Sequence, residues 1–192
     1  RNSISGGDFE RFTRRFGWKK YLRGIDYDRY WEYPAAYENL RLGAGEKKLL
    51  DIGAGDYSVF PLFAASRSDV DARITDFDAP RLPAQREWVR RLAPILRKTP
   101  VVERQDARKL TYRSSSFDAV SCISTIEHIG PPEDGDIRAA REIARVLRKG
   151  GRAFLSFPYS YHGYWLEYAH HGPGYRKLPA PVFFQRWYDD EG

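Results

Sequence analysis

The sequence predicts an α/β fold: a mostly parallel sheet with helices on both faces. Two observations predict it. Short apolar runs alternate with helical patterns from Lys48 to Phe157, and the first run ends in an acid and breaks into alternating glycines at Gly53 and Gly55. Strands separated by helices require right-handed crossovers, which make neighbouring strands parallel. A strand, a glycine-rich turn and a helix in succession build a pocket at the carboxyl end of the strand.

Residues 1–45 are rich in aromatic and basic side chains and lack strand alternation. We expect them to form an N-terminal helical cap segment in front of the sheet, with Pro34 at a helix start, where proline is favoured. Residues 46–192 then form the main domain.

The elements of the main domain follow in order. The first helix begins within residues 57–65, and the second, opened by Asp78 as N-cap with Pro80 in its first turn, covers residues 79–97. A third helix covers residues 134–147 and is stopped by Gly150-Gly151. The expected strands are residues 48–52, 72–75, 101–104, 119–123 and 152–157.

Composition and charge set few limits on function. The length of 192 residues fits one domain, and 42% hydrophobic with 30% charged residues is ordinary globular composition. A net charge of +6 suits an anionic or nucleic-acid partner, but a solvated basic surface explains it equally well. The lone Cys122 excludes an internal disulfide and favours a reducing, cytoplasmic location.

Two further observations concern the chain as a whole. No apolar run reaches the length of a membrane span, and no signal peptide is visible. The chain begins at Arg1 and contains no methionine, which indicates a processed, trimmed or partial gene product.

The glycine-rich turn argues against a dinucleotide. A nicotinamide or flavin dinucleotide site favours a third glycine and a helix N-terminus that faces a diphosphate. Here Asp56 follows the second glycine directly, and Ser58 stands in place of the third. A dehydrogenase stays an alternative; it predicts that a nicotinamide cofactor binds, which calorimetry can test.

Three acids at the ends of successive strands predict the ligand. Asp51 can accept from an ammonium group, Asp76 can hold both hydroxyls of a ribose, and Asp106 can accept from the exocyclic amine of adenine. An ammonium, a ribose and an adenine together describe S-adenosylmethionine.

The chain resembles the class I S-adenosylmethionine-dependent methyltransferases from about Leu49 to Tyr159. The segments LLDIGAGD, ITDFD, RQDARKLTYRSSSFDAV, CISTIEHI and REIARVLRKGGRAFLSFP are similar to the family motifs and stand in family order. An earlier stretch, RYWEYPAAYENL, resembles the segment that precedes the first strand in a bacterial subgroup. The resemblance implies a Rossmann-like sheet with strand order 3-2-1-4-5.

The resemblance also implies roles for matching positions. Asp51, Gly53 and Gly55 of the first motif hold the methionine portion, Asp76 the ribose, and Phe77 one adenine face. Asp106 and Ala107 meet the adenine edge, and the residues leaving the fourth strand lie near the sulfonium. The full set of implied cofactor residues is Asp51, Gly53, Ala54, Gly55, Asp76, Phe77, Asp106, Ala107, Ile123 and Ser124.

Transfer of a methyl group to a hydroxyl benefits from a base, and histidine suits this near neutral pH. The catalytic candidates are His128, after the fourth strand, and His162; His170 and His171 are weaker ones. A helix residue bonded to nearby backbone explains His128 equally well. Residues 158–185, dense in aromatic and turn residues, are expected to form a substrate lid. Glu127 is expected to tie its turn to backbone amides.

Other observations narrow the substrate. The fourth strand lacks the Asn/Asp-Pro-Pro-aromatic motif of enzymes that methylate base amines. No Cys/His cluster has metal-ligand spacing. We therefore expect O-methylation of a small or carbohydrate-like molecule and no metal. RNA or protein methylation and a non-catalytic module that keeps the cofactor fold stay open as alternatives, and oligomeric state cannot be read.

The C-terminal part departs from the family pattern. Members continue after the fifth strand with a helix and an antiparallel strand pair. PVFFQRWYDDEG is similar to the approach to that helix, with Asp189 as its N-cap. We therefore expect the antiparallel pair to be missing and the outer edge of the fifth strand to be uncovered.

Overall fold

The computed structural model describes residues 3–16, 27–57, 59–171 and 177–191. Its centre is a five-stranded parallel sheet in the predicted order, β3-β2-β1-β4-β5. The strands are β1 (Lys47–Ile52), β2 (Val70–Asp76), β3 (Val101–Arg104), β4 (Phe117–Ile123) and β5 (Leu147–Ser156).

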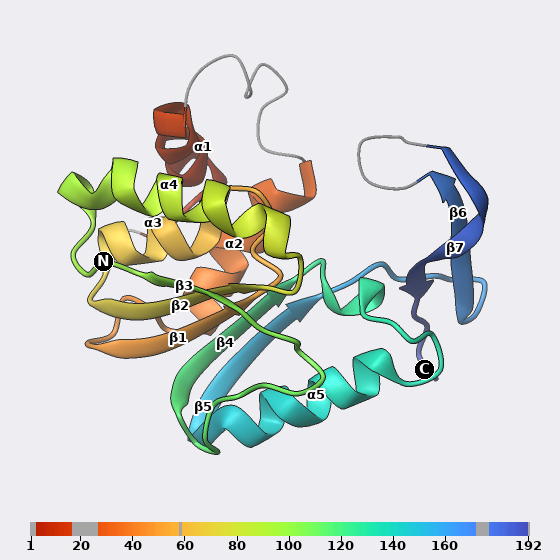
Figure 1. Ribbon diagram of the computed structural model, residues 1–192. Coiled ribbons are helices and arrows are strands. Elements are labelled where there is room, and N and C mark those ends of the chain that lie inside the picture. The colour runs from red at the N-terminus through yellow and green to blue at the C-terminus, as the bar shows by residue number, and fades with distance from the viewer. Residues whose placement is uncertain (1–2, 17–26, 58, 172–176, 192) are drawn as a thin grey trace.

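Helices cover both faces of this sheet, as predicted (Figure 1). Four helices belong to one hydrophobic cluster, which takes Leu49 from β1 and Ile74 from β2. They are α1 (Gly6–Thr13), α2 (Tyr27–Asn39), α3 (Val59–Arg67) and α4 (Leu82–Leu92). The other face packs Leu50 and Val120 against α5 (Gly135–Val146). Neighbouring residues of one strand thus enter different cores, because side chains alternate across a strand.

The prediction that Pro34 starts a helix is wrong, because Pro34 lies inside α2. A proline there cannot donate to the carbonyl four residues earlier, that of Tyr30. Gly6 of α1 lies over this position, where an added Cβ would stand 2.5 Å from the Tyr30 carbonyl oxygen. A glycine at this helix crossing therefore allows α1 to approach α2 closely.

Two helix boundaries also differ from prediction. The expected helix over residues 79–97 is α4 flanked by two short 3-10 turns, Ala79–Arg81 and Ala93–Ile95. Asp78 has the N-cap position of the first turn but makes no capping hydrogen bond with its side chain. Helix α5 ends at Val146, before Gly150-Gly151, because Leu147 is already extended and pairs with Phe117.

The prediction that the C-terminal antiparallel pair is missing is wrong. Strands β6 (Trp165–His171) and β7 (Lys177–Trp187) form a separate antiparallel sheet, and the predicted helix start is part of β7 and the segment after it. Trp165 and Trp187 lie opposite each other and stack, with ring centroids 5.3 Å apart and planes 4° from parallel. Such cross-strand aromatic pairs stabilise a two-stranded sheet.

The β6–β7 hairpin projects from the body beside the segment that connects β4 to α5 (Figure 1). It does not extend the parallel sheet, of which β5 is an edge strand. None of the described helices is long and apolar enough to cross a membrane.

Candidate functional site

A cavity of about 950 Å³ lies at the carboxyl ends of the parallel strands. This is where ligands bind in open α/β sheets, and the volume falls at the upper end of small-molecule sites. All ten residues predicted to bind the cofactor border it: Asp51, Gly53, Ala54, Gly55, Asp76, Phe77, Asp106, Ala107, Ile123 and Ser124. His128 borders it as well, whereas His162 does not.

The glycine-rich turn after β1 is held by backbone hydrogen bonds to β2. The amides of Gly53 and Ala54 donate to the carbonyl of Thr75 at 3.0 and 3.1 Å. Gly53 has φ +73°, and a Cβ there would lie 2.2 Å from the Thr125 methyl carbon. Gly55 has φ +63°, and a Cβ there would meet only Nη1 of Arg81, at an ordinary contact distance of 3.9 Å. Gly53 is thus required for conformation and space, and Gly55 for conformation alone.

Asp51 is a buried acid at the end of β1. Its Oδ1 accepts a hydrogen bond from the Ser121 hydroxyl, and the residue is only 5% exposed. Burial raises the pKa of Asp51 to about 7; the Ser121 hydrogen bond opposes this and the charge of Asp76 adds to it. A cation bound beside Asp51 would favour the ionised form.

Asp76, at the end of β2, supports the turn. Its Oδ2 accepts from the Gly55 amide at 3.1 Å and its Oδ1 from the Asp78 amide at 2.9 Å. Arg81 lies among three carboxylates, with nitrogen-oxygen distances of 3.8 Å to Asp56, 4.0 Å to Asp76 and 3.3 Å to Asp78. The buried Asp76 therefore has free lone pairs for a ligand beside its two amide bonds.

Asp106 already has a cationic partner. The guanidinium of Arg108 binds both of its oxygens, at 2.9 and 2.7 Å, and this side-chain hydrogen bond is the main cause that lowers the pKa of Asp106. Both Arg104 and Arg108 also lie over the ring of Phe77, 5.3 and 5.7 Å from its centroid. Phe77 is 57% exposed and borders the cavity, so it offers a planar surface.

The end of β4 is joined to helix α2. Ser124 has φ +42°, and its hydroxyl accepts from Nη1 of Arg29 at 2.6 Å and donates to Glu32 at 3.2 Å. Arg29 and Glu32 form an ion pair with each other. Charge and burial at this end of the cavity thus come from the N-terminal cap segment.

Sequence reasoning did not assign Arg29, Arg81 or Thr125 a role, although all three border the cavity. In the sequence, the RYWEYP stretch carries only a family resemblance. Its Arg29 and Glu32 have the i,i+3 spacing of a helical ion pair, which could have identified a charged helix face.

His128 follows β4 in a short 3-10 turn, Ile126–His128, and its Nδ1 is 2.7 Å from the carbonyl oxygen of Phe184. A carbonyl only accepts, so Nδ1 carries the proton and Nε2 of the neutral ring has a free lone pair. Glu127 beside it is 2% exposed, and burial raises its pKa to about 7. Among the described residues its Oε2 has no hydrogen-bond partner.

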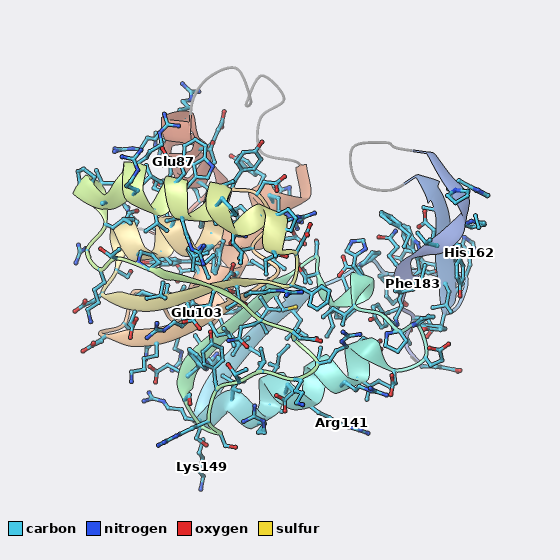
Figure 2. The ribbon with its side chains drawn as sticks, viewed as in Figure 1. Glu87, Glu103, Arg141, Lys149, His162 and Phe183 are labelled. Atoms are coloured by element: carbon cyan, nitrogen blue, oxygen red, sulfur yellow. The ribbon has the colours of Figure 1, made fainter. Side chains whose placement is uncertain are left out.

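The other histidine candidates lie on the C-terminal segment. Figure 2 shows His162 on the hairpin side of the molecule, and its backbone amide donates to the Ser160 hydroxyl. His170 is exposed on β6, and the side chain of His171 lies outside the described residues. Of the expected lid, Phe184 borders the cavity.

Comparisons with known proteins found a family model and several relatives. Residues 50–155 match the family model described as "Methyltransferase domain". A ubiquinone biosynthesis O-methyltransferase of Xanthomonas oryzae pv. oryzae is 34% identical over 123 residues, which are 62% of this chain and 46% of that protein. A demethylmenaquinone methyltransferase of Mycobacterium tuberculosis is 29% identical over 147 residues, 77% of this chain and 55% of that protein. The chain thus spans about half the length of the curated relatives it matches.

Solved structures share the fold. A structure described as a SAM-dependent methyltransferase from Methanosarcina mazei has a TM-score of 0.64 at 19% identity and covers 83% of this chain and 79% of its own. A [4+2]-cyclase has a TM-score of 0.59 at 22% identity and covers 83% of this chain and 51% of its own. One fold therefore serves two kinds of chemistry.

Proposed function

The chain belongs to the class I S-adenosylmethionine-dependent methyltransferases, and we propose that it transfers a methyl group to a hydroxyl oxygen of a small molecule. The observation that carries the proposal is the convergence of Asp51, Asp76 and Asp106 on one cavity from three neighbouring strands. S-adenosylmethionine, the cofactor of this family, supplies a methyl group on a sulfonium that leaves as a neutral thioether.

The cavity residues fit this cofactor. Asp51 would hold the ammonium, and its raised pKa marks a buried acid without a cation. Asp76 would bind the ribose hydroxyls, while Phe77 and Asp106 would hold the adenine. The Arg29 guanidinium, beside Ser124 and Ile123, would pair with the carboxylate of the methionine portion. No phosphate is needed to explain these groups.

His128 would act as the base. Its Nε2 lone pair would take the proton as the acceptor oxygen forms its new bond to carbon, leaving an imidazolium whose Nδ1–H stays bonded to Phe184. The residues themselves contribute alignment and exclusion of water, which account for much of the rate in displacements of this kind.

We place the acceptor in the part of the cavity bordered by His128 together with a wall of Phe184, Ile129 and Gly130. This wall is apolar and includes an aromatic ring, so it favours a planar hydroxylated ring over a carbohydrate. The names of the relatives, which refer to ubiquinone biosynthesis and demethylmenaquinone, support the same choice.

The test of the cofactor site is calorimetry with S-adenosylhomocysteine. Asp76→Ala should weaken binding by about tenfold or more, since a hydrogen bond to a charged group contributes about 1.5–3 kcal/mol. Asp71→Ala, five residues earlier on the same strand and outside the cavity lining, is the matched control. Equal affinities of the two variants would remove the ribose role of Asp76.

The test of the reaction is transfer of a radioactive methyl group to a panel of phenols, catechols, sugars and RNA. Phenols or catechols should be labelled, with loss of labelling in His128→Gln. Tight cofactor binding without labelling of any acceptor would favour a non-methylating role, as in the [4+2]-cyclase of the same fold.

A further inference from the structure

The hairpin is fastened to the body by a buried cation. Arg186 of β7 is fully buried, and its guanidinium donates to the carbonyls of Ile129 at 2.9 Å and Pro131 at 2.7 Å, with the Glu127 carbonyl at 3.3 Å. Its Nε lies 3.2 Å from Oδ2 of Asp136 in the first turn of α5. A buried guanidinium with this many partners is costly to disturb, because removal leaves several polar groups unpaired.

The three carbonyl partners of Arg186 lie in one segment of chain, residues 127–131. The carbonyls of Glu127 and Ile129 precede and follow His128 in the chain, so the guanidinium holds the backbone on both sides of this histidine. Arg108 adds a fourth bond to the same segment, from its Nη1 to the Gly130 carbonyl at 2.5 Å.

A bulge in β7 lets the hairpin contact this segment twice. Glu167 pairs with Gln185 but Tyr168 pairs with Phe183, so Phe184 is an extra residue in β7. In a regular strand, adjacent side chains point to opposite faces. Here Phe183 lies against Gly130 and the Arg186 guanidinium, while Phe184 meets the His128 ring edge-on, with centroids 5.0 Å apart. Figure 2 shows Phe183 on the side of the hairpin that faces the body.

The bulge also directs the Phe184 carbonyl at His128. Because this carbonyl accepts from Nδ1, it selects the tautomer in which Nε2 is free to take a proton. Free histidine favours the opposite tautomer, with the proton on Nε2. Bulges near active sites commonly redirect groups in this way.

We propose that Arg186 is a positioning residue for proton removal: it locks the bulged strand against residues 127–131 so that the Phe184 carbonyl holds His128 in its Nε2-basic tautomer. This rests on the proposed O-methylation, in which His128 is the base. The hairpin would then be a fixed part of the acceptor site, one that supplies both an aromatic wall and the hydrogen bond that orients the base.

Charged groups from several elements lie near His128. Oε1 of Glu127 lies 3.8 Å from Nε2 of His128, and the charge of Arg29 in α2 lowers the pKa of Glu127. Arg186 and Asp136 form an ion pair with each other. The test therefore compares Arg186→Lys, which keeps all of these charges, with Arg186→Gln, which removes the charge at position 186.

The experiment is nitrogen NMR of the imidazole side chains in the full chain, without cofactor. In the wild-type protein the His128 resonances should show a protonated Nδ1 and an unprotonated Nε2 at high pH. Arg186→Lys keeps the charge but loses the forked geometry, and Arg186→Gln loses both. In each, the Nε2-protonated tautomer should grow to at least about half of the neutral population.

The matched control is Gln185→Ala, next to Arg186 on the same strand, which removes a hydrogen bond to Glu167 within the hairpin. It should leave the His128 tautomer as in the wild-type protein. Calorimetry with S-adenosylhomocysteine should give affinities within about twofold in all four proteins, because Arg186 does not border the cavity.

The outcomes separate this inference from the proposed function. If His128 keeps its Nδ1 proton in folded Arg186→Lys, the positioning role of Arg186 is refuted, even when cofactor binds normally. If S-adenosylhomocysteine does not bind the wild-type protein, the cofactor assignment fails while the tautomer measurement still decides the role of Arg186. Should Arg186→Gln fail to fold, Arg186→Lys decides alone.

Discussion

Gly53 offers a sharp test of the cofactor turn, because two physical costs meet at this residue. Its φ of +73° is a left-handed conformation, which costs a residue with a Cβ about 1–2 kcal/mol. In addition, the Cβ of an alanine would lie 2.2 Å from Cγ2 and 2.3 Å from Oγ1 of Thr125. Such overpacking typically costs about 1–3 kcal/mol. We expect Gly53→Ala to lower the free energy of unfolding by about 2–5 kcal/mol.

Gly45 provides the matched control. It has φ +79°, and a Cβ there would meet nothing within 4 Å. Gly45→Ala therefore carries the conformational cost alone, about 1–2 kcal/mol. The entropy that alanine removes from the unfolded chain is the same at both positions and cancels in the comparison. The excess loss in Gly53→Ala then measures the contact with Thr125.

The assay is urea unfolding of both variants, combined with a double-mutant cycle. Thr125→Ala removes Cγ2 and Oγ1 and leaves Cβ, which would lie 2.8 Å from the new methyl group, so it should recover part of the excess. If Gly53→Ala and Gly45→Ala lose equal stability, or if Thr125→Ala recovers nothing, the crowded turn does not exist as described.

Two further predictions concern charge at the same cavity. Burial raises the pKa of Asp51 to about 7, above the unfolded value of about 3.9, so the folded protein holds the extra proton and the free energy of unfolding should fall as pH rises between these values. The measurement is urea unfolding at several pH values. Asp51→Asn should make the fall in stability with pH less steep without removing it, because Glu127 also has a pKa of about 7. If the stability of Asp51→Asn falls with pH as steeply as that of the wild-type protein, Asp51 is not a buried, uncompensated acid. Arg29→Ala should weaken the binding of S-adenosylhomocysteine by about tenfold in calorimetry, because a charge-assisted hydrogen bond is lost. The control is Arg14→Ala, which changes an exposed arginine and should leave the affinity as it is. Equal affinities of the two variants would exclude the carboxylate role of Arg29.

The sequence was informative where chemistry and local structure coincide. Strand β3 has the predicted bounds, and the acids that end β1 and β2 border the cavity. A strand buried on both faces has to be apolar along its length, so a charged residue at its carboxyl end marks the edge of the sheet. The position of the site follows from that rule together with the parallel topology.

The C-terminal hairpin could not be predicted in the same way. Its strands pair residues 165–171 with residues 177–187, and aromatic-rich stretches of this kind fit a lid as well as a strand. Trp165 stacks on Trp187 although the two residues are far apart in the sequence, and no local sequence periodicity predicts this contact. The burial of Arg186 could not be predicted either, because the sequence does not distinguish a fully buried arginine from a solvent-exposed one.

Long-range contacts also decide what single side chains can do. His128 was identified from its place after β4, but its tautomer depends on a carbonyl 56 residues later in the chain. Arg29 reaches Ser124 across 95 residues. Residue type thus predicts the candidates, whereas the proton and charge arrangement depends on the tertiary fold.

The charge of the cavity argues most directly for the kind of ligand. Among the described residues that border it, carboxylates outnumber guanidinium groups: the acids are Asp51, Asp56, Asp76, Asp78 and Asp106, and the cations are Arg29, Arg81 and Arg108. A diphosphate would add negative charge to this excess, at a turn where Asp56 follows Gly55 directly. A ligand with a sulfonium, an ammonium and one carboxylate has a net positive charge, which would offset the excess of negative charge in the cavity. Burial is the main cause that raises the pKa of Asp51, and the charge of Asp76 adds to it, so a cation bound beside Asp51 would take the place of this proton.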